Sequence, residues 1–210
     1  MKICVCACQY YHRIPHEKIA AVQAACRVAL VLCEIVPDLC LAAVRESRDA
    51  YDTVLACQSR AVRSLVGEKV NVFDLRSVSL ADVLAALSLP TVESPNEPVY
   101  EKSDSRWIPW FPVIDAVRCV QCKKCVDFCL FGVYSIEDGT VRVTQPQACK
   151  TDCPACARIC PQNAIMFPKS EEDRLNGTLT EQVKPSESDK VSFRERLQHR
   201  KKLRLFKEDT

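Results

Sequence analysis

Two cysteine-rich stretches in the second half of the chain decide its fold. Residues 119–129 read CVQCKKCVDFC, with the spacing C-x2-C-x2-C-x3-C, and residues 149–161 read CKTDCPACARICP, with the spacing C-x3-C-x2-C-x3-C-P. The two runs form an internal repeat with an offset of 31 residues, so that three cysteines of the first run recur in the second: Cys122, Cys125 and Cys129 as Cys153, Cys156 and Cys160. This repetition predicts two related sites of four thiolates each.

Sites of four thiolates suit a 4Fe-4S cluster, which presents four iron corners that each need a thiolate. Cysteines two or three residues apart in a tight turn can wrap three of these corners, and the fourth thiolate arrives from elsewhere in the chain. Zinc held by paired C-x2-C motifs is the alternative, but such zinc sites usually have a longer spacer between the two pairs. We therefore expect iron rather than zinc.

The region 111–168 resembles the bacterial two-cluster ferredoxins. Leu130 stands where that family usually has proline, and the second run has one extra residue between its first two cysteines. The resemblance implies an α+β fold with two pseudo-symmetric hairpins and short helices, in which the last cysteine of each run ligates the other cluster. It assigns cluster 1 to Cys119, Cys122, Cys125 and Cys160, and cluster 2 to Cys149, Cys153, Cys156 and Cys129.

The first half of the chain alternates short apolar runs with helical patterns. The expected strands are KICVCA, ALVLCEIV, DTVLAC and KVNVFDL, each short and rich in valine, isoleucine and leucine. Helices are expected over 16–27, after Pro37, over 61–66 before Gly67, and from Ser79 to residue 87. This order predicts an α/β domain with a small parallel sheet and flanking helices.

Several of the seven cysteines in this half follow expected strands. The carboxyl ends of parallel strands meet at one edge of a sheet, where ligands bind. The half also resembles, over residues 2–76, the cluster-binding amino-terminal domain of the flavin-containing subunit of heterodisulfide reductase, through the C-x-C at Cys6 and Cys8, the TVLACQSRAVRSL segment and VFDLR. The resemblance implies a third 4Fe-4S cluster on Cys6, Cys8, Cys33 and Cys57, with Cys40 as the reserve ligand. Plain buried thiols are the alternative.

Changes in composition and in apolar periodicity divide the chain into four parts. Residues 1–88 form the cysteine-rich α/β domain, and residues 89–106, with three prolines and little apolar periodicity, form a linker. Residues 107–169 form the two-cluster domain, in which Asp138 and Gly139 have the preferred residue types for a two-residue hairpin turn. Residues 170–210 form a polar tail that ends in a basic stretch.

The composition excludes several other classes of protein. The 29 Lys and Arg nearly balance the 27 Asp and Glu, so we expect no nucleic-acid partner from charge alone. None of the four glycines precedes residue 67, which argues against flavin or nicotinamide binding after the first strand. Residues 1–15 lack the apolar core of a signal peptide, and no run approaches the roughly 20 apolar residues that cross a bilayer. We expect a cytoplasmic protein without membrane insertion.

The sequence thus predicts an electron carrier with no catalytic residues of its own. It would relay single electrons through two 4Fe-4S clusters, or three, to or from an oxidoreductase. One alternative is a non-catalytic iron–sulfur subunit of a larger redox complex that resembles heterodisulfide reductase. Another is a cluster-dependent regulator that uses the basic tail.

Overall fold

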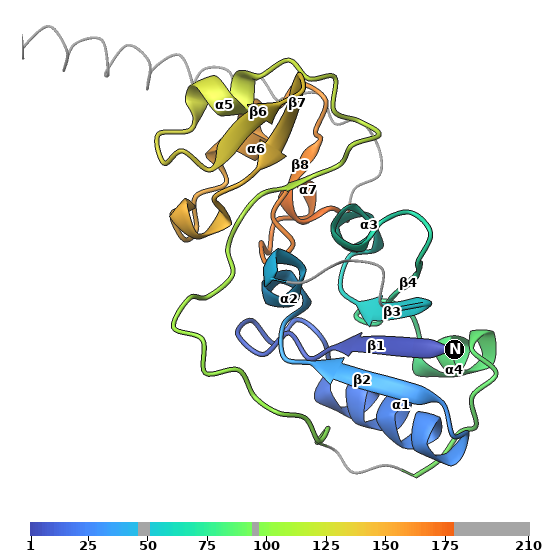
Figure 1. Cartoon of the computed structure of the whole chain (residues 1–210). Coiled ribbons are helices and arrows are strands. Elements are labelled where there is room, and N and C mark those ends of the chain that lie inside the picture. The colour runs from blue at the N-terminus through green and yellow to red at the C-terminus, as the bar shows by residue number, and fades with distance from the viewer. Residues whose placement is uncertain (46–50, 94–96, 179–210) are drawn as a thin grey trace, which may run out of the picture.

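The computed structural model describes residues 1–45, 51–93 and 97–178 of the chain. A four-stranded parallel sheet with helices comes first, and small antiparallel strand pairs with short helices follow (Figure 1). This confirms the expected fold class. The basic stretch at the end of the expected tail lies outside the described residues.

The first half alternates strands and helices in the order β1, α1, β2, α2, β3, α3, β4, α4. All neighbours in its sheet are parallel, in the order β2-β1-β3-β4. The strands are β1 (Lys2–Cys6), β2 (Leu32–Val36), β3 (Thr53–Ala56) and β4 (Asn71–Asp74). The helices are α1 (His16–Val28), α2 (Leu39–Arg45), α3 (Ser59–Val66) and α4 (Leu80–Ala86).

Local sequence explains where these elements lie. β1 and β3 are the two central strands, and their run of apolar residues matches burial on both faces. The Ser79 hydroxyl accepts a hydrogen bond from the Asp82 backbone N–H and caps α4 at its amino end. α3 ends before Gly67, whose φ of 100° few other residues adopt.

The second half contains two antiparallel strand pairs. β5 (Val113–Ile114) pairs with β8 (Ile165–Met166), and β6 (Tyr134–Glu137) pairs with β7 (Thr140–Val143). Asp138 and Gly139 both have positive φ, which is the backbone of the type I′ turn expected between β6 and β7. The helical elements are α5 (Lys124–Phe128), the 3-10 turn η1 (Pro146–Ala148), α6 (Ala155–Ile159) and α7 (Asp173–Asn176).

One hydrophobic core runs through both halves of the molecule. Phe111, Val113 and Met166 belong to the same cluster of buried residues as the side chains of β1 and β3. The connection between the halves also lies along the first: Gln9 exchanges hydrogen bonds of 2.8 Å with the Ser103 backbone, and the Tyr10 hydroxyl donates to the Ser105 carbonyl. The two halves are therefore packed together.

An ion pair between α3 and the end of β5 fixes this packing. The Arg60 Nε lies 2.7 Å from the Asp115 Oδ2, and both side chains are about nine-tenths buried. Arg60 also donates to the Asn163 carbonyl at 2.5 Å, just before β8.

None of the helices in the described ranges is long and apolar enough to cross a membrane.

We expect Arg60→Met to destabilise the protein, because the variant leaves the buried Asp115 carboxylate without its closest cation. Losing one partner of a buried pair costs about 3 kcal/mol. The matched control is Arg142→Met, because the pair of Arg142 with Glu137 is more than half exposed and such pairs contribute about 0–1 kcal/mol. The measurement is the midpoint of guanidinium-induced unfolding under anaerobic conditions. Equal midpoints for the two variants would show that the Arg60 contact does not hold the halves together.

Candidate metal centres

Four cysteines from the two runs line one cavity in the second half. The cavity contains about 380 Å³ of empty space, part of it open to solvent, and lies between the loop before α5 and the start of β8. Burial, followed by the charges of Cys160 and Cys119, raises the pKa of the Cys125 thiol to about 11. Three cysteines of the first run thus meet the last cysteine of the second: Cys119, Cys122, Cys125 and Cys160.

The loop around this cavity uses left-handed backbone without glycine. Gln121 has φ of 53° and Lys123 has φ of 62°. Alternating right- and left-handed residues turn successive backbone N–H groups into a concavity, a geometry that suits anions and many iron–sulfur sites. The Gln121 side chain also accepts a 2.7 Å hydrogen bond from the Val141 backbone N–H, which ties the loop to β7. The loop is therefore shaped and held for a negatively charged group.

The other four cysteines of the runs form the second set. Burial raises the pKa values of Cys149 and Cys156 to about 12, and in both cases the charges of neighbouring cysteines add to the effect. Those neighbours come from both runs, since Cys129 and Cys153 act on each of the two thiols. The structure thus brings together Cys129, Cys149, Cys153 and Cys156.

A buried hydroxyl beside the second set lacks a well-formed hydrogen bond in the part of the chain that the structure describes. Tyr134, the first residue of β6, is 8% exposed, and its hydroxyl forms no hydrogen bond of proper geometry with a described residue. Burial raises its pKa, and the charge of the adjacent Cys156 raises it further, so the hydroxyl keeps its proton. A buried donor without a well-formed hydrogen bond is uncommon in folded proteins. Beside four thiols, it suits a site whose bound group would accept that hydrogen bond.

The spacing of the thiols also bears on zinc. Among the described residues, no three cysteine, histidine, aspartate or glutamate side chains are gathered as they would be around a single metal ion. A zinc ion draws its four ligands onto one atom, whereas a cubane carries each thiolate on a separate iron corner.

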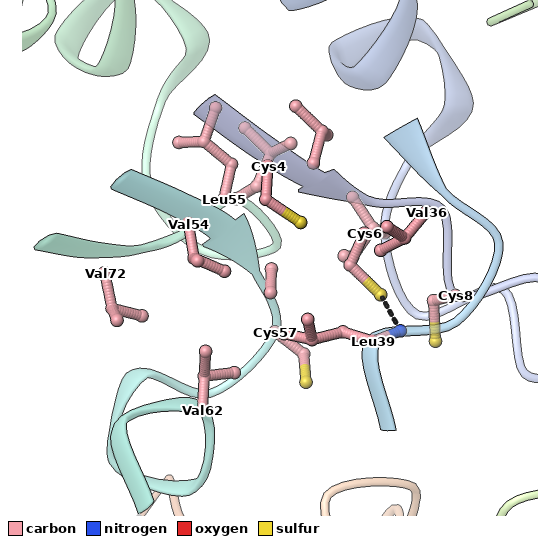
Figure 2. Packing of buried hydrophobic residues seen from close by; sticks show 14 of the residues in the cluster. Cys4, Cys6, Cys8, Val36, Leu39, Val54, Leu55, Cys57, Val62 and Val72 are labelled. Carbon is pink, nitrogen blue, oxygen red and sulfur yellow. Dashed lines mark hydrogen bonds between the residues drawn. The ribbon is translucent and has the colours of Figure 1, made fainter. Parts of the chain in front are cut away.

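Cysteines also gather at the carboxyl edge of the parallel sheet. Cys6 ends β1, Cys8 follows it, and Cys57 follows β3; Figure 2 shows these three thiols near one another, with Cys4 farther back along β1. All three are at least 94% buried. The Leu39 backbone N–H, at the start of α2, donates to the Cys6 sulfur at 3.3 Å. Burial raises the pKa of Cys6 well above its usual value and that of Cys57 to about 12.

A lysine from the second half reaches this edge. Lys169 is 4% exposed, and its Nζ lies 2.5 Å from the Asp38 carboxylate and 3.4 Å from the Cys8 sulfur. The Asp38 carboxylate also accepts a hydrogen bond from the Cys40 backbone N–H. The edge therefore holds a buried ion pair as well as thiols, and the two halves of the chain build it together.

The structure does not bring Cys33 to this edge. Cys33 is the second residue of β2 and pairs with Ile3, whereas Cys6 pairs with Val36 at the end of β2. Three residues of strand place it about 10 Å short of the edge. Its thiol lies against that of Cys26 on α1, and this contact, together with burial, raises its pKa. The expectation that Cys33 lies with the other three thiols is wrong.

Cys40, the reserve ligand, lies at the edge where Cys33 was expected. It lies in the first turn of α2 and is 6% exposed. Burial raises its pKa well above the usual value, and the groups whose charges act on it include Lys169, Asp38 and Cys57. The four thiols at the edge are Cys6, Cys8, Cys40 and Cys57.

Reasoning from sequence missed three polar residues of these sites. Lys169 and Asp38 lie 131 residues apart, and no local pattern links them. Tyr134 carries a weak signal, because the 31-residue repeat aligns it with the apolar Ile165. A polar side chain opposite an apolar one in a repeated core position is the kind of difference that marks a specific role.

Three aromatic rings lie between the sheet edge and the second cysteine set. Tyr11 lies under the Lys169 Nζ, which is 5.2 Å from the ring centroid, and its own centroid is 6.3 Å from that of Trp110. Trp110 in turn stacks on Phe167 at 5.3 Å. These rings pack against the core that contains Cys156 and adjoins Cys149.

Comparison with known proteins gives one partial relationship. Models of known protein families give no match to the chain. Over 70 residues, the chain is 46% identical to an uncharacterized ferredoxin of Methanocaldococcus jannaschii. The similarity covers 33% of this chain and 48% of that ferredoxin, so the chain spans about half of its relative's length. The chain is thus a distant, partial homologue of a ferredoxin and has 15 cysteines.

Proposed function

We propose that this protein is an iron–sulfur electron carrier that relays single electrons through two 4Fe-4S clusters. One cluster is held by Cys119, Cys122, Cys125 and Cys160, and the other by Cys149, Cys153, Cys156 and Cys129. The observation that carries the proposal is the cavity lined by three cysteines of one run and the last cysteine of the other. The partial similarity to a ferredoxin supports the same function.

The chain's residues would prepare each site for electron transfer. A bound cluster takes up and gives off one electron with little movement of its ligands, at a potential set by hydrogen bonds, charge and burial. Lys123 and Lys124 line the cavity of the first set, where positive charge favours the reduced state. Short helices and loops hold the thiols in place, and the buried core behind them excludes water.

A permanently docked subunit of a larger redox complex is the second candidate. Apolar side chains flank the cysteine runs and face solvent, among them Val117, Val120 and Leu130, which are 60% to 84% exposed. Such residues are typical of a surface that contacts another protein. A carrier would use this surface transiently and a docked subunit permanently, so the native mass of the protein as purified from its source distinguishes the two.

We extend the proposal to a third cluster at the sheet edge, on Cys6, Cys8, Cys40 and Cys57. Four buried thiols from three segments meet there, and a buried lysine donates to one of them. A lysine cation and the Leu39 N–H beside the sulfurs would offset part of the negative charge of four thiolates and a cluster. Structural thiols that happen to pack together are the alternative.

For the two-cluster proposal, anaerobic protein should contain about four irons and four sulfides for each cluster it holds. Cys160→Ala should remove one cluster. Combined with Cys122→Ala, it should remove no further iron, because both residues serve the same cluster. Combined with Cys153→Ala, it should remove a second cluster. Iron and sulfide analysis with low-temperature paramagnetic resonance measures each outcome.

The reverse pattern would overturn the crossed ligand sets. If Cys160→Ala were additive with Cys122→Ala but not with Cys153→Ala, each run would bind its own cluster. Zinc at full occupancy without sulfide would overturn the function itself.

The third cluster is tested by two cysteines of the first half that lie within seven residues of each other. Cys40→Ala should lower the iron content by about one cluster, or about four irons, because Cys40 completes the set at the edge. Cys33→Ala is the matched control and should leave the iron content unchanged, because its thiol faces Cys26. If both variants and the parent contained the same amount of iron, the edge would hold only packed thiols and no cluster.

A further inference from the structure

The two cysteine sets differ in one buried polar group. The internal repeat aligns Tyr134 at the start of β6 with Ile165 at the start of β8. Ile165 is 3% exposed and lines the cavity of the first set, where it offers only hydrocarbon. Tyr134 has the corresponding place beside the second set and offers a hydroxyl. The pseudo-symmetry of the fold is therefore broken at the sites themselves.

The Tyr134 hydroxyl has a proton to donate and lies beside the Cys156 thiol, but it forms no hydrogen bond of proper geometry with a described residue. A buried donor whose hydrogen bond is not properly formed is destabilising. The Cys156 thiol lies in the same buried core and acts on this hydroxyl most strongly, whereas Cys125 of the first set and Cys129 act on it less. A cluster on this set would bring electron-rich sulfur to the hydroxyl, which would give the donor its acceptor and remove that destabilisation.

We propose that the Tyr134 hydroxyl donates a hydrogen bond to a sulfur of the cluster on Cys129, Cys149, Cys153 and Cys156, and thereby raises the reduction potential of this cluster alone. The inference rests on the two-cluster function proposed above. A hydrogen bond to sulfur stabilises the reduced state more than the oxidised state, because the reduced cluster carries one more negative charge. Ile165 provides no such donor to the other cluster.

Burial acts on the two sites in the opposite direction. Cys156 of the second set is 8% exposed, whereas Cys122 of the first set is exposed to solvent. A less exposed cluster gains charge less readily, so burial alone would lower the potential of the second cluster. The Tyr134 hydroxyl counteracts this difference. The quantity to measure is therefore the change in each potential when the hydroxyl is removed.

The test compares Tyr134→Phe with Tyr10→Phe in the full-length, cluster-loaded protein. Both variants remove one hydroxyl and keep the ring, but the Tyr10 hydroxyl donates to the Ser105 carbonyl in the connection between the halves. Potentiometric titration followed by low-temperature paramagnetic resonance should show one reduction step of Tyr134→Phe at lower potential and every other step unmoved. Tyr10→Phe should move neither step.

Two further measurements assign the effect. In Cys122→Ala, which should lose the first cluster, the step that Tyr134→Phe lowers should remain. Nuclear-electron double resonance in D2O should reveal an exchangeable proton coupled to that cluster in the parent and missing in Tyr134→Phe. A loss of packing would not by itself produce this signature.

Outcomes that contradict the inference are distinct from failure of the proposed function. Unmoved steps in Tyr134→Phe, or equal shifts of both steps, would overturn the role of the hydroxyl while leaving an intact two-cluster carrier. Parent protein without iron and sulfide would instead remove the function on which the inference rests.

Discussion

The whole second half depends on bringing the last cysteine of each run to the first three cysteines of the other. Each proposed site takes thiols from both runs, so it is complete only when α5 and α6 pack together and β5 pairs with β8. The Asp115 backbone N–H donates to the Ala164 carbonyl at 2.8 Å next to this strand pair, which places Cys160 at the cavity of the first run. A short sheet of two strands is marginal by itself. Ligation of metal across the two runs would contribute the missing stability.

The same strand pair also joins the second half to the parallel sheet. Asp115 receives Arg60 from α3, and Phe111, Val113 and Met166 enter the core of the first half. Lys169, which follows β8, contacts Asp38 and Cys8 at the sheet edge. The edge is thus not a property of residues 1–88 alone. Without the second half, the Asp38 carboxylate would lose the Lys169 cation. The thiols at the edge would also lose some of the residues that bury them.

Periodicity and spacing in the sequence predict most of this fold, and the reasons are local. Strand and helix patterns, the Ser79 cap, Gly67 and the Asp138–Gly139 turn act within a few residues, and each element lies within a few residues of its expected place. The crossed sets of four cysteines come from the resemblance to two-cluster ferredoxins, because local spacing does not show which run supplies the fourth cysteine of each set. Cys33 was misplaced because a run of apolar residues does not show how far a residue lies from the strand's end. Lys169 could not be found, because its partner Asp38 is close only after both halves have folded.

The arrangement of the sites gives the proposed relay a direction in space. Cys149 of the second set packs against the core shared with the sheet, while the cavity of the first set opens to solvent beside the exposed Cys122. The second set is therefore the inner site and the first set the outer one. The rings of Tyr11, Trp110 and Phe167 fill the space between the inner site and the sheet edge. In the proposed relay, an electron that enters from a partner at the outer site would pass the inner site before it reached the sheet edge. The proposed donor hydroxyl on the inner site, where burial opposes reduction, would bring the potential of the inner cluster back toward that of its neighbour and so favour this middle step.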